Sequence, residues 1–367
     1  MVTARHLYVH VPFCARRCVY CDFSIAVRRS TPVDEYLAAL ARELDQKSSA
    51  IGELDTVYLG GGTPSRLGGE GIARVLDMIR ANAAVDPGAE VTIEMNPDDV
   101  TAELARQAKS AGVNRISLGV QSFDDSTLQW MHRVHDSETA RDAFNMLRAE
   151  GFENISLDLI FALPDSLNRS WNRDLEQAID LNPEHISLYG LTIESATPLG
   201  RWSAAGSVSA ADEEKYAAEF LLADRAAIAA GFEHYEVSNF AKPGRRSRHN
   251  SAYWTGARYV GLGPSAHSFD GSARSWNVAP YAEWVERLMN GESAVADSEV
   301  LTESNREAEK VYLGLRTRAG VAVTDQDRHS ADLWSEKGWA EIDGDVVRLT
   351  SEGWLRLDSL AAALTGF

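Results

Sequence analysis

The stretch Tyr8–Phe23, YVHVPFCARRCVYCDF, ends a β-branched and aromatic run with a loop that carries Cys14, Cys18 and Cys21. The chain of 367 residues has no other cysteine. Thiolates at this CxxxCxxC spacing can hold three irons of a cubane iron–sulfur cluster, whereas a cluster ligated by protein alone takes four cysteines. One iron is therefore left open, and a small ligand with an amine and a carboxylate can bind it.

Two other uses of the cysteines stay open. A structural zinc site needs four ligands, and His10 could supply the fourth. Cysteines with a purely structural role behave as small apolar side chains and are expected to scatter through the core rather than gather in one loop. An odd number of cysteines also argues against a disulfide framework and for a reducing compartment.

Strand-like runs alternate with helical patterns through the first half of the chain, which predicts βα units around a parallel sheet. The near-continuous apolar character of ISLDLIF and ISLYGL is typical of strands covered on both faces. Six units are too few for a closed eight-stranded barrel, so we expect an α/β fold with a partial (β/α)6 barrel and its site at the C-terminal strand ends. The predicted strands are Leu7–Val11, Thr56–Leu59, Val91–Met95, Arg115–Val120, Ile155–Phe161 and His185–Leu191, with helices such as Val33–Gln46 and Ser137–Ala149 between them.

The pattern changes near residue 200, which predicts three units: a barrel at 1–200, an accessory region at 201–300 and a C-terminal module at 301–367. The accessory region has an acidic helix, Ala211–Ala230, short strand candidates and an arginine-dense loop at Gly244–Arg248. We expect it to add an α+β layer to the barrel. The module, with the helix EAEKVYLGLRTR and the hairpin WAEIDGDVVRLT, is expected to be a small helix-and-wing, or winged-helix-like, unit.

Composition places the chain among soluble globular proteins, since 44% of the residues are hydrophobic and 25% are charged. The formal net charge of −18 repels phosphate backbones and anionic lipid surfaces, so nucleic acid is not expected as a partner. The sequence shows neither a signal-peptide pattern nor eighteen consecutive apolar residues. These features predict a cytoplasmic protein with at most peripheral membrane contact.

Polar residues and glycines follow several of the predicted strands at their C-terminal ends. The run Gly60–Thr63 lets backbone groups approach a ligand without interference from a Cβ atom. Glu94, Gln121 and Asp158 end three other strands. Each of these side chains could be a buried hydrogen-bonded group of structural value alone. Three of them at equivalent positions favour a ligand that offers ribose hydroxyls and an ammonium group.

The motifs together resemble the HemW family of heme chaperones in the radical S-adenosylmethionine (SAM) superfamily, a relative of the oxygen-independent coproporphyrinogen III oxidases. The resemblance covers nearly the whole chain and rests on YVHVPFCxxxCxYCDF, GGGTPS, EMNP, GVQSF, DLIFALP, SLYGLTIESATPL, YEVSNFAKPG, HNSAYW and GLGPSAHSF. It implies a [4Fe-4S] cluster held by Cys14, Cys18 and Cys21, with SAM at the open iron. It further implies heme, apo-hemoprotein acceptors and a homodimer. The residues that it places around SAM are Tyr8, Gly61, Gly62, Thr63, Glu94, Gln121, Arg133 and Asp158.

The segment Arg248–Trp254, RHNSAYW, resembles the heme-binding HNxxYW motif of that family and implies heme contacts by His249, Asn250, Tyr253 and Trp254. Imidazole is a common axial ligand of heme iron, and aromatic rings can stack on a porphyrin. The alternative is a solvated arginine loop before an aromatic-anchored strand. Three arginines next to the motif suit the heme propionates, and two histidines are candidates for a second axial ligand or for contacts near SAM. They are Arg245, Arg246, Arg248, His10 and His267.

Phe23 is a departure from the oxidase branch, whose pattern CxxxCxxCxC has a further cysteine at this position. The departure argues against coproporphyrinogen III decarboxylation. It leaves the rival class open, in which the protein is a radical SAM enzyme that acts on a porphyrinogen or a radical SAM methylase. The sequence assigns no catalytic residue.

Overall fold

Six parallel strands form the centre of the molecule and pair in the order β1–β4–β5–β6–β7–β8. The computed structural model describes residues 3–325 and 327–366. All six predicted strands are confirmed, and β1, β4 and β5 begin earlier than predicted. The observed bounds are β1 Ala4–Val11, β4 Ile51–Gly61, β5 Val85–Met95, β6 Arg115–Gln121, β7 Ile155–Phe161 and β8 His185–Gly190.

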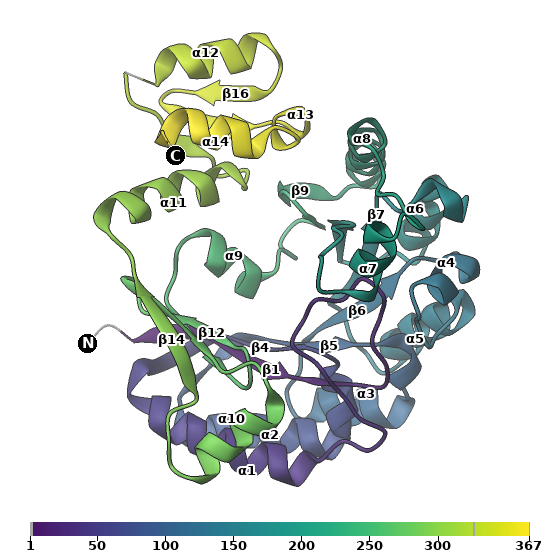
Figure 1. Ribbon diagram of the computed structural model, residues 1–367, viewed down its shortest axis with the longest axis vertical. Coiled ribbons are helices and arrows are strands. Elements are labelled where there is room, and N and C mark those ends of the chain that lie inside the picture. Colours follow the sequence, from purple (N-terminus) through teal and green to yellow (C-terminus); the bar gives the residue numbers. More distant parts are fainter. Residues whose placement is uncertain (1–2, 326, 367) are drawn as a thin grey trace.

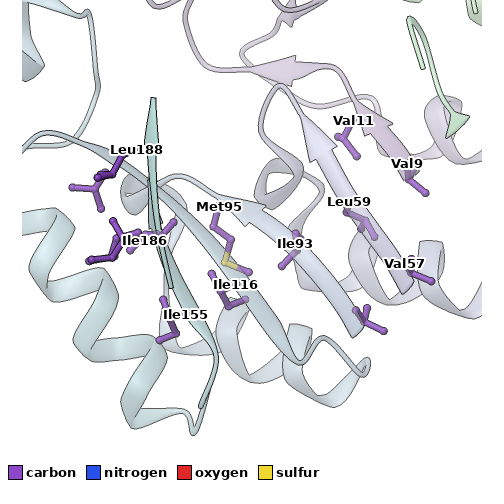
Figure 2. Close-up of a cluster of buried hydrophobic side chains, with 14 of the residues drawn as sticks. Val9, Val11, Val57, Leu59, Ile93, Met95, Ile116, Ile155, Ile186 and Leu188 are labelled. Carbon is purple, nitrogen blue, oxygen red and sulfur yellow. The ribbon is translucent and has the colours of Figure 1, made fainter. Parts of the chain in front are cut away.

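Apolar and polar side chains alternate along these strands between two buried faces. Figure 2 shows the apolar set, in which residues such as Val9, Leu59 and Ile93 lie on neighbouring strands. This set belongs to one core cluster with helix residues such as Leu40 and Ile79. Successive strand residues point to opposite faces, so the intervening polar residues face the inside of the partial barrel. The strands are therefore covered on both faces as predicted, but their inner face is polar.

Helices cover the outer face of the sheet (Figure 1). The predicted helix at Val33–Gln46 ends one residue later, and the one at Ser137–Ala149 is found with those bounds. Asp136 fixes the start of the latter, because its side chain accepts a hydrogen bond from Thr139 N at 2.8 Å. The helices are α1 Val33–Lys47, α2 Gly68–Asn82, α3 Ala102–Ser110, α5 Ser137–Ala149 and α6 Trp171–Asp180, with the short α4 Asp125–Trp130 before α5.

The accessory region differs from the separate layer that was expected, because its strands extend the barrel sheet at both edges into a twelve-stranded sheet. A parallel sheet leaves unpaired backbone groups on its two outer strands, and these segments pair with them. At the β1 edge lie β11 Tyr259–Leu262, β12 His267–Phe269, β13 Ala273–Asn277 and β14 Val295–Val300. At the β8 edge lie β10 Asn239–Ala241 and β9 Glu233–Glu236. The helices of this region include α7 Pro198–Ala204, α8 Glu213–Ala229 and α10 Tyr281–Met289.

Helix α9, Arg248–Trp254, lies on the inner side of the sheet, opposite α1 and α2 (Figure 1). The Glu90 carboxylate of β5 accepts hydrogen bonds from the backbone N–H groups of Arg248 and His249, at 3.0 and 2.9 Å. These bonds satisfy helix N-terminal donors and anchor α9 against the sheet. The helix therefore covers part of the polar inner face.

The C-terminal segment contains the predicted helix and hairpin. Its first helix begins earlier and ends earlier than predicted. Strands β16 and β17 form the hairpin, which β15 joins to make a three-stranded sheet. Strands of 201–300 share one sheet with the barrel. The division into three units stays a prediction. The elements are α11 Glu303–Leu315, β15 Val321–Ala322, α12 Arg328–Glu336, β16 Ala340–Asp343, β17 Val346–Leu349, α13 Ser351–Trp354 and α14 Leu357–Thr365. Within the described residues, none of the helices has the length and apolarity needed to span a bilayer.

Candidate functional site

The cysteine loop is closed at its base by a two-stranded ribbon. Strand β2, Phe13–Cys14, pairs in parallel with β3, Ala26–Val27, and the loop between them carries Cys18 and Cys21. Val19, in the middle of the loop, donates its N–H to Met131 O at 3.2 Å. Its carbonyl accepts from the N–H of Leu199 at 2.9 Å. The loop is thus held against two other segments at the C-terminal end of the sheet.

A cavity of about 480 Å³ lies beside this loop, and all three cysteines line it. Seven of the eight residues expected around SAM line the same cavity: Gly61, Gly62, Thr63, Glu94, Gln121, Arg133 and Asp158. They come from β4, β5, β6, β7 and the loop after α4, because the C-terminal ends of parallel strands meet at one edge of the sheet. Tyr8, the eighth, is the exception. It lies in a neighbouring cavity, with its ring 6.1 Å from that of Tyr58.

The thiols face polar groups and one arginine. Cys14 Sγ lies 3.5 Å from Thr63 Oγ1, and Arg133 Nη1 donates to Cys18 Sγ at 3.6 Å. Burial raises the pKa of the Cys14 thiol, and it raises that of Cys21 to about 11. Iron must therefore displace protons from these thiols when it binds. The donor set fits a cluster with three protein ligands, because three thiols and free cavity volume lie together.

The geometry around His10 bears on the zinc alternative. His10 Nε2 lies 2.9 Å from Ser24 O, and His10 Nδ1 lies 3.1 Å from the Tyr8 hydroxyl. Both ring nitrogens thus have protein partners and neither points to the thiols as a fourth ligand. Among the described residues, no group of three or more His, Cys, Asp or Glu side chains is arranged around a single metal ion.

Two carboxyl groups lie on the inner face of the sheet at the floor of the cavity. Glu94 accepts hydrogen bonds from the Tyr58 hydroxyl at 2.8 Å and from Gly61 N at 2.9 Å. Asp158 accepts from Ser117 Oγ at 2.8 Å, and burial raises its pKa. Burial also raises the pKa of Glu94 to about 7. These groups can accept hydrogen bonds from hydroxyl or ammonium groups of a ligand.

The glycine run lies directly against β1, the strand that precedes the cysteine loop. Gly61 has a φ of 112°, and a Cβ atom there would lie 2.6 Å from the His10 ring. Gly62 donates its N–H to Val11 O at 2.9 Å, at the end of β1. Glycine is required here because the backbone adopts a positive φ and passes close to the neighbouring strand.

Asn96 and Tyr58 were missed as site residues from the sequence. Asn96 Nδ2 donates to Thr63 Oγ1 at 3.1 Å, and its Oδ1 accepts from Arg133 Nη2 at 2.6 Å. Asn96 therefore positions two of the expected SAM contacts at once. The EMNP motif contains it, but a side chain beyond the strand end has no periodicity that would show where it points.

A second cavity, of about 870 Å³, lies next to the first and shares Asp22, Phe23, Gly61 and Glu94 with it. Its volume is within the roughly 300–1,000 Å³ range of small-molecule sites. Most of its large side chains are aromatic: Tyr8, Phe23, Tyr253, Trp254, Tyr259, Phe269 and Trp276. An aromatic wall of this kind suits a flat, extended ring system.

The expected heme residues divide between this cavity and the interior. Tyr253 and Trp254 line the cavity, whereas His249 and Asn250 do not. His249 is 1% exposed, with Nδ1 2.7 Å from Thr56 Oγ1 and Nε2 2.8 Å from the Tyr253 hydroxyl. Burial lowers its pKa to about 3. In this structure the imidazole of His249 is thus neutral, and both of its nitrogens are engaged.

The arginines before the motif are not part of the second cavity's lining. Arg246 forms an ion pair with Glu233 at 2.9 Å, and Arg248 Nη1 donates to Gly88 O at 2.6 Å. Neither of them, nor Arg245, is among the residues that line the second cavity. The cation in that lining is Arg274, on β13.

The raised pKa of Glu94 predicts that the stability of the cofactor-free protein depends on pH. Its raised pKa comes first from burial and next from Asp158, while the Tyr58 bond and Arg115 oppose the shift. The unfolded chain releases this proton near pH 4.5 and the folded chain near pH 7. The stabilising contribution is therefore complete at low pH and is lost as the pH rises through this window.

The unfolding free energy of the parent protein should decline between about pH 5 and pH 8. We expect this decline to be smaller by about 2 kcal/mol in Glu94→Gln. Urea unfolding of both proteins across this range measures it. Glu236, whose pKa burial also raises to about 7, is common to both proteins and cancels in the difference. Equal pH slopes for the two proteins would contradict the prediction.

Comparison with known proteins gives the same picture from three directions. The family model of the radical SAM superfamily matches residues 8–178. The chain is 37% identical to the heme chaperone HemW of Mycobacterium tuberculosis (strain CDC 1551 / Oshkosh), over 98% of this chain and 94% of that protein. It is also 37% identical to the heme chaperone HemW of Bacillus subtilis (strain 168), over 98% of both.

The solved structure of coproporphyrinogen III oxidase (HemN) from Escherichia coli, a radical SAM enzyme, has a TM-score of 0.83 to this chain. It covers 99% of this chain and 90% of its own, with 21% sequence identity. This likeness shows a shared fold across nearly the whole chain.

Proposed function

Because this chain belongs to the HemW family of the radical SAM superfamily, we propose that it binds heme and transfers it to apo-hemoproteins. The observation that carries the proposal is the pair of adjoining cavities, one lined by three thiols and the other by aromatic rings. A heme chaperone needs a surface for the flat porphyrin, and the second cavity offers one. The acceptors are proposed as a class, the apo-hemoproteins.

The first cavity is proposed to hold a [4Fe-4S] cluster on Cys14, Cys18 and Cys21, with SAM at the open iron. A bound cluster of this kind supplies one-electron transfer. SAM would lie among the seven residues of that lining that the family resemblance indicates. Glu94 and Asp158 would accept hydrogen bonds from it, while Arg133, held by Asn96, keeps a positive charge beside Cys18. Tyr8 lines only the second cavity, so it would support the SAM site indirectly, across the residues that line both cavities.

One heme is proposed to bind in the second cavity beside α9. Tyr253 and Trp254 supply aromatic surface there. His249 and Asn250 do not line the cavity and would support its wall. The His249 ring lies 2.8 Å from the Tyr253 hydroxyl, and the N–H of Asn250 donates to Ser247 Oγ at the start of the helix. In this arrangement the HNxxYW motif builds the wall of the site.

Phe23 supports a chaperone rather than an oxidase. Its side chain is 58% exposed and lies where the two cavities meet, at the position where the oxidase pattern has a cysteine. An aromatic ring at this place extends the apolar surface towards the cluster loop. We infer that the chain does not decarboxylate coproporphyrinogen III. We also propose a cytoplasmic homodimer, as the family resemblance implies.

Hemin titration of the anaerobically reconstituted protein tests the proposal. The expected result is a Soret absorption change that saturates at about one hemin per chain, followed by transfer of the heme to an added apo-hemoprotein, seen as the acceptor's own spectrum. A titration without a Soret change contradicts it. So does stoichiometric formation of 5′-deoxyadenosine with consumption of coproporphyrinogen III in the presence of dithionite, because that result assigns the protein to the enzymes.

A further inference from the structure

Part of the wall of the second cavity is formed by the strands that extend the sheet beyond β1. Tyr259 comes from β11, His267 and Phe269 from β12, and Arg274 and Trp276 from β13. His267 and Trp276 are direct partners in the β12–β13 ladder. Their rings stack with centroids 5.9 Å apart and an interplanar angle of 28°. This wall therefore presents an imidazole whose orientation is supported by an indole.

The histidines near the heme cavity differ in what their ring nitrogens contact. Both nitrogens of His10 and both of His249 have hydrogen-bond partners within the protein. The described part of the chain gives His267 no hydrogen-bond partner at either ring nitrogen, and its side chain is exposed to the cavity. An iron ligand needs a free nitrogen lone pair, and of these three histidines His267 offers one in this structure.

The charge around His267 also suits ligation. Partial burial and the nearby Arg274 guanidinium lower the pKa of its imidazole, which favours the neutral form that can donate a lone pair. Arg274 lines the same cavity and forms an ion pair with Glu309 of α11 at 2.7 Å. A heme propionate could share this guanidinium, because it has donors in a planar fork.

We propose that His267 is an axial ligand of the heme iron in the second cavity, with Arg274 as the counter-charge of a propionate. This inference rests on the proposed heme binding and adds the residue that holds the iron. Tyr253 and Trp254 of α9 would supply aromatic surface to the porphyrin, and His249 remains a positioning residue that orients Tyr253. The two histidines therefore have separable roles: loss of His267 removes an iron ligand, and loss of His249 loosens a wall.

The test is a hemin titration of the reconstituted full chain and of His267→Ala, with His329→Ala as the matched control. His329 is an exposed histidine of α12 and does not line the second cavity. We expect His267→Ala to raise the hemin dissociation constant at least about tenfold and to shift the Soret maximum and the ferric electron paramagnetic resonance spectrum. Added imidazole should restore the original spectrum in His267→Ala, and His329→Ala should match the parent protein.

The outcomes separate this inference from the proposed function. If the parent protein binds no hemin, the proposed function itself fails. If the parent binds hemin and His267→Ala does so with the same affinity and spectra, the assignment of His267 is overturned. The variant His249→Ala gives a second measurement: we expect weaker binding with an unchanged ligand-field spectrum, and a loss of the axial imidazole signature in this variant would instead identify His249 as the ligand. Thermal unfolding of each variant checks that its fold is retained.

Discussion

Replacing Cys18 by alanine is expected to abolish assembly of the iron–sulfur cluster. The three cysteines are already one thiolate short of the set that protein-only sites use, so loss of one more leaves two irons of a cubane without a protein ligand. Cys18 is only partly buried, whereas Cys14 is buried, so Cys18→Ala tests the ligand with little change to the core. After anaerobic reconstitution, the iron and labile sulfide content should fall at least about tenfold, together with the visible absorption of the cluster. SAM affinity should fall with it.

The matched control is Arg17→Ala, which changes an exposed side chain of the same loop without removing a thiol. It should retain the iron and sulfide content of the parent protein. Retention of iron and sulfide by Cys18→Ala would contradict the proposed ligand set. Metal analysis that returns zinc without sulfide from oxygen-free parent protein would overturn the cluster itself.

Glu43→Ala is expected to have the largest effect on stability. Glu43 lies in α1 with 0% exposure, and its carboxylate joins the helix to the strands and helix beyond β1. It accepts hydrogen bonds from Gly263 N at 2.8 Å, Asn277 Nδ2 at 2.6 Å and Trp284 Nε1 at 3.0 Å, and it forms an ion pair with Lys47 at 2.7 Å. Truncation leaves these donors and a cation without their partner. We therefore expect a loss of about 3–5 kcal/mol in unfolding free energy, measured by urea denaturation.

Glu103→Ala provides the comparison for this variant. Glu103 is also a helix glutamate, and it pairs with Arg106 at 2.6 Å, but both side chains are exposed. Its removal should change the unfolding free energy by no more than about 0.5 kcal/mol. A loss of less than about 1 kcal/mol for Glu43→Ala would show that the buried network does not hold α1 to the sheet extension.

The barrel and its first cavity could be predicted from the chain because their signals are local. Each strand has its own β-branched run; Glu94 and Gln121 stand at the C-terminal end of such a run, and Asp158 stands in the middle of one. Parallel strands bring these ends together whatever the details of packing. For this reason seven of the eight expected SAM residues line one cavity. Tyr8 falls outside it because its strand presents that ring to α9 rather than to the thiols.

The sheet extensions were not predicted, because strand pairing at an edge depends on segments far apart in the chain. Strand β11 pairs with β1, with Leu7 opposite Val260 and Val9 opposite Leu262. Short strands such as β12 have too few residues for a clear alternation pattern. The accessory region therefore looked like a separate layer, whereas its strands complete the sheet and build one wall of the second cavity.

The sequence by itself determined the three-thiol loop, the six parallel strands and the polar positions at their ends, because spacing and alternation are properties of neighbouring residues. Only the tertiary structure decided which histidine ring nitrogens have hydrogen-bond partners and which are free to bind a ligand. His249 meets Thr56, 193 residues away, and is thereby buried with both nitrogens engaged. His267, on the short strand β12 between β11 and β13, has no hydrogen-bond partner at its ring nitrogens among the described residues and lines the cavity. The physical reason is that a lone pair is available to a ligand only when long-range packing leaves it without a partner.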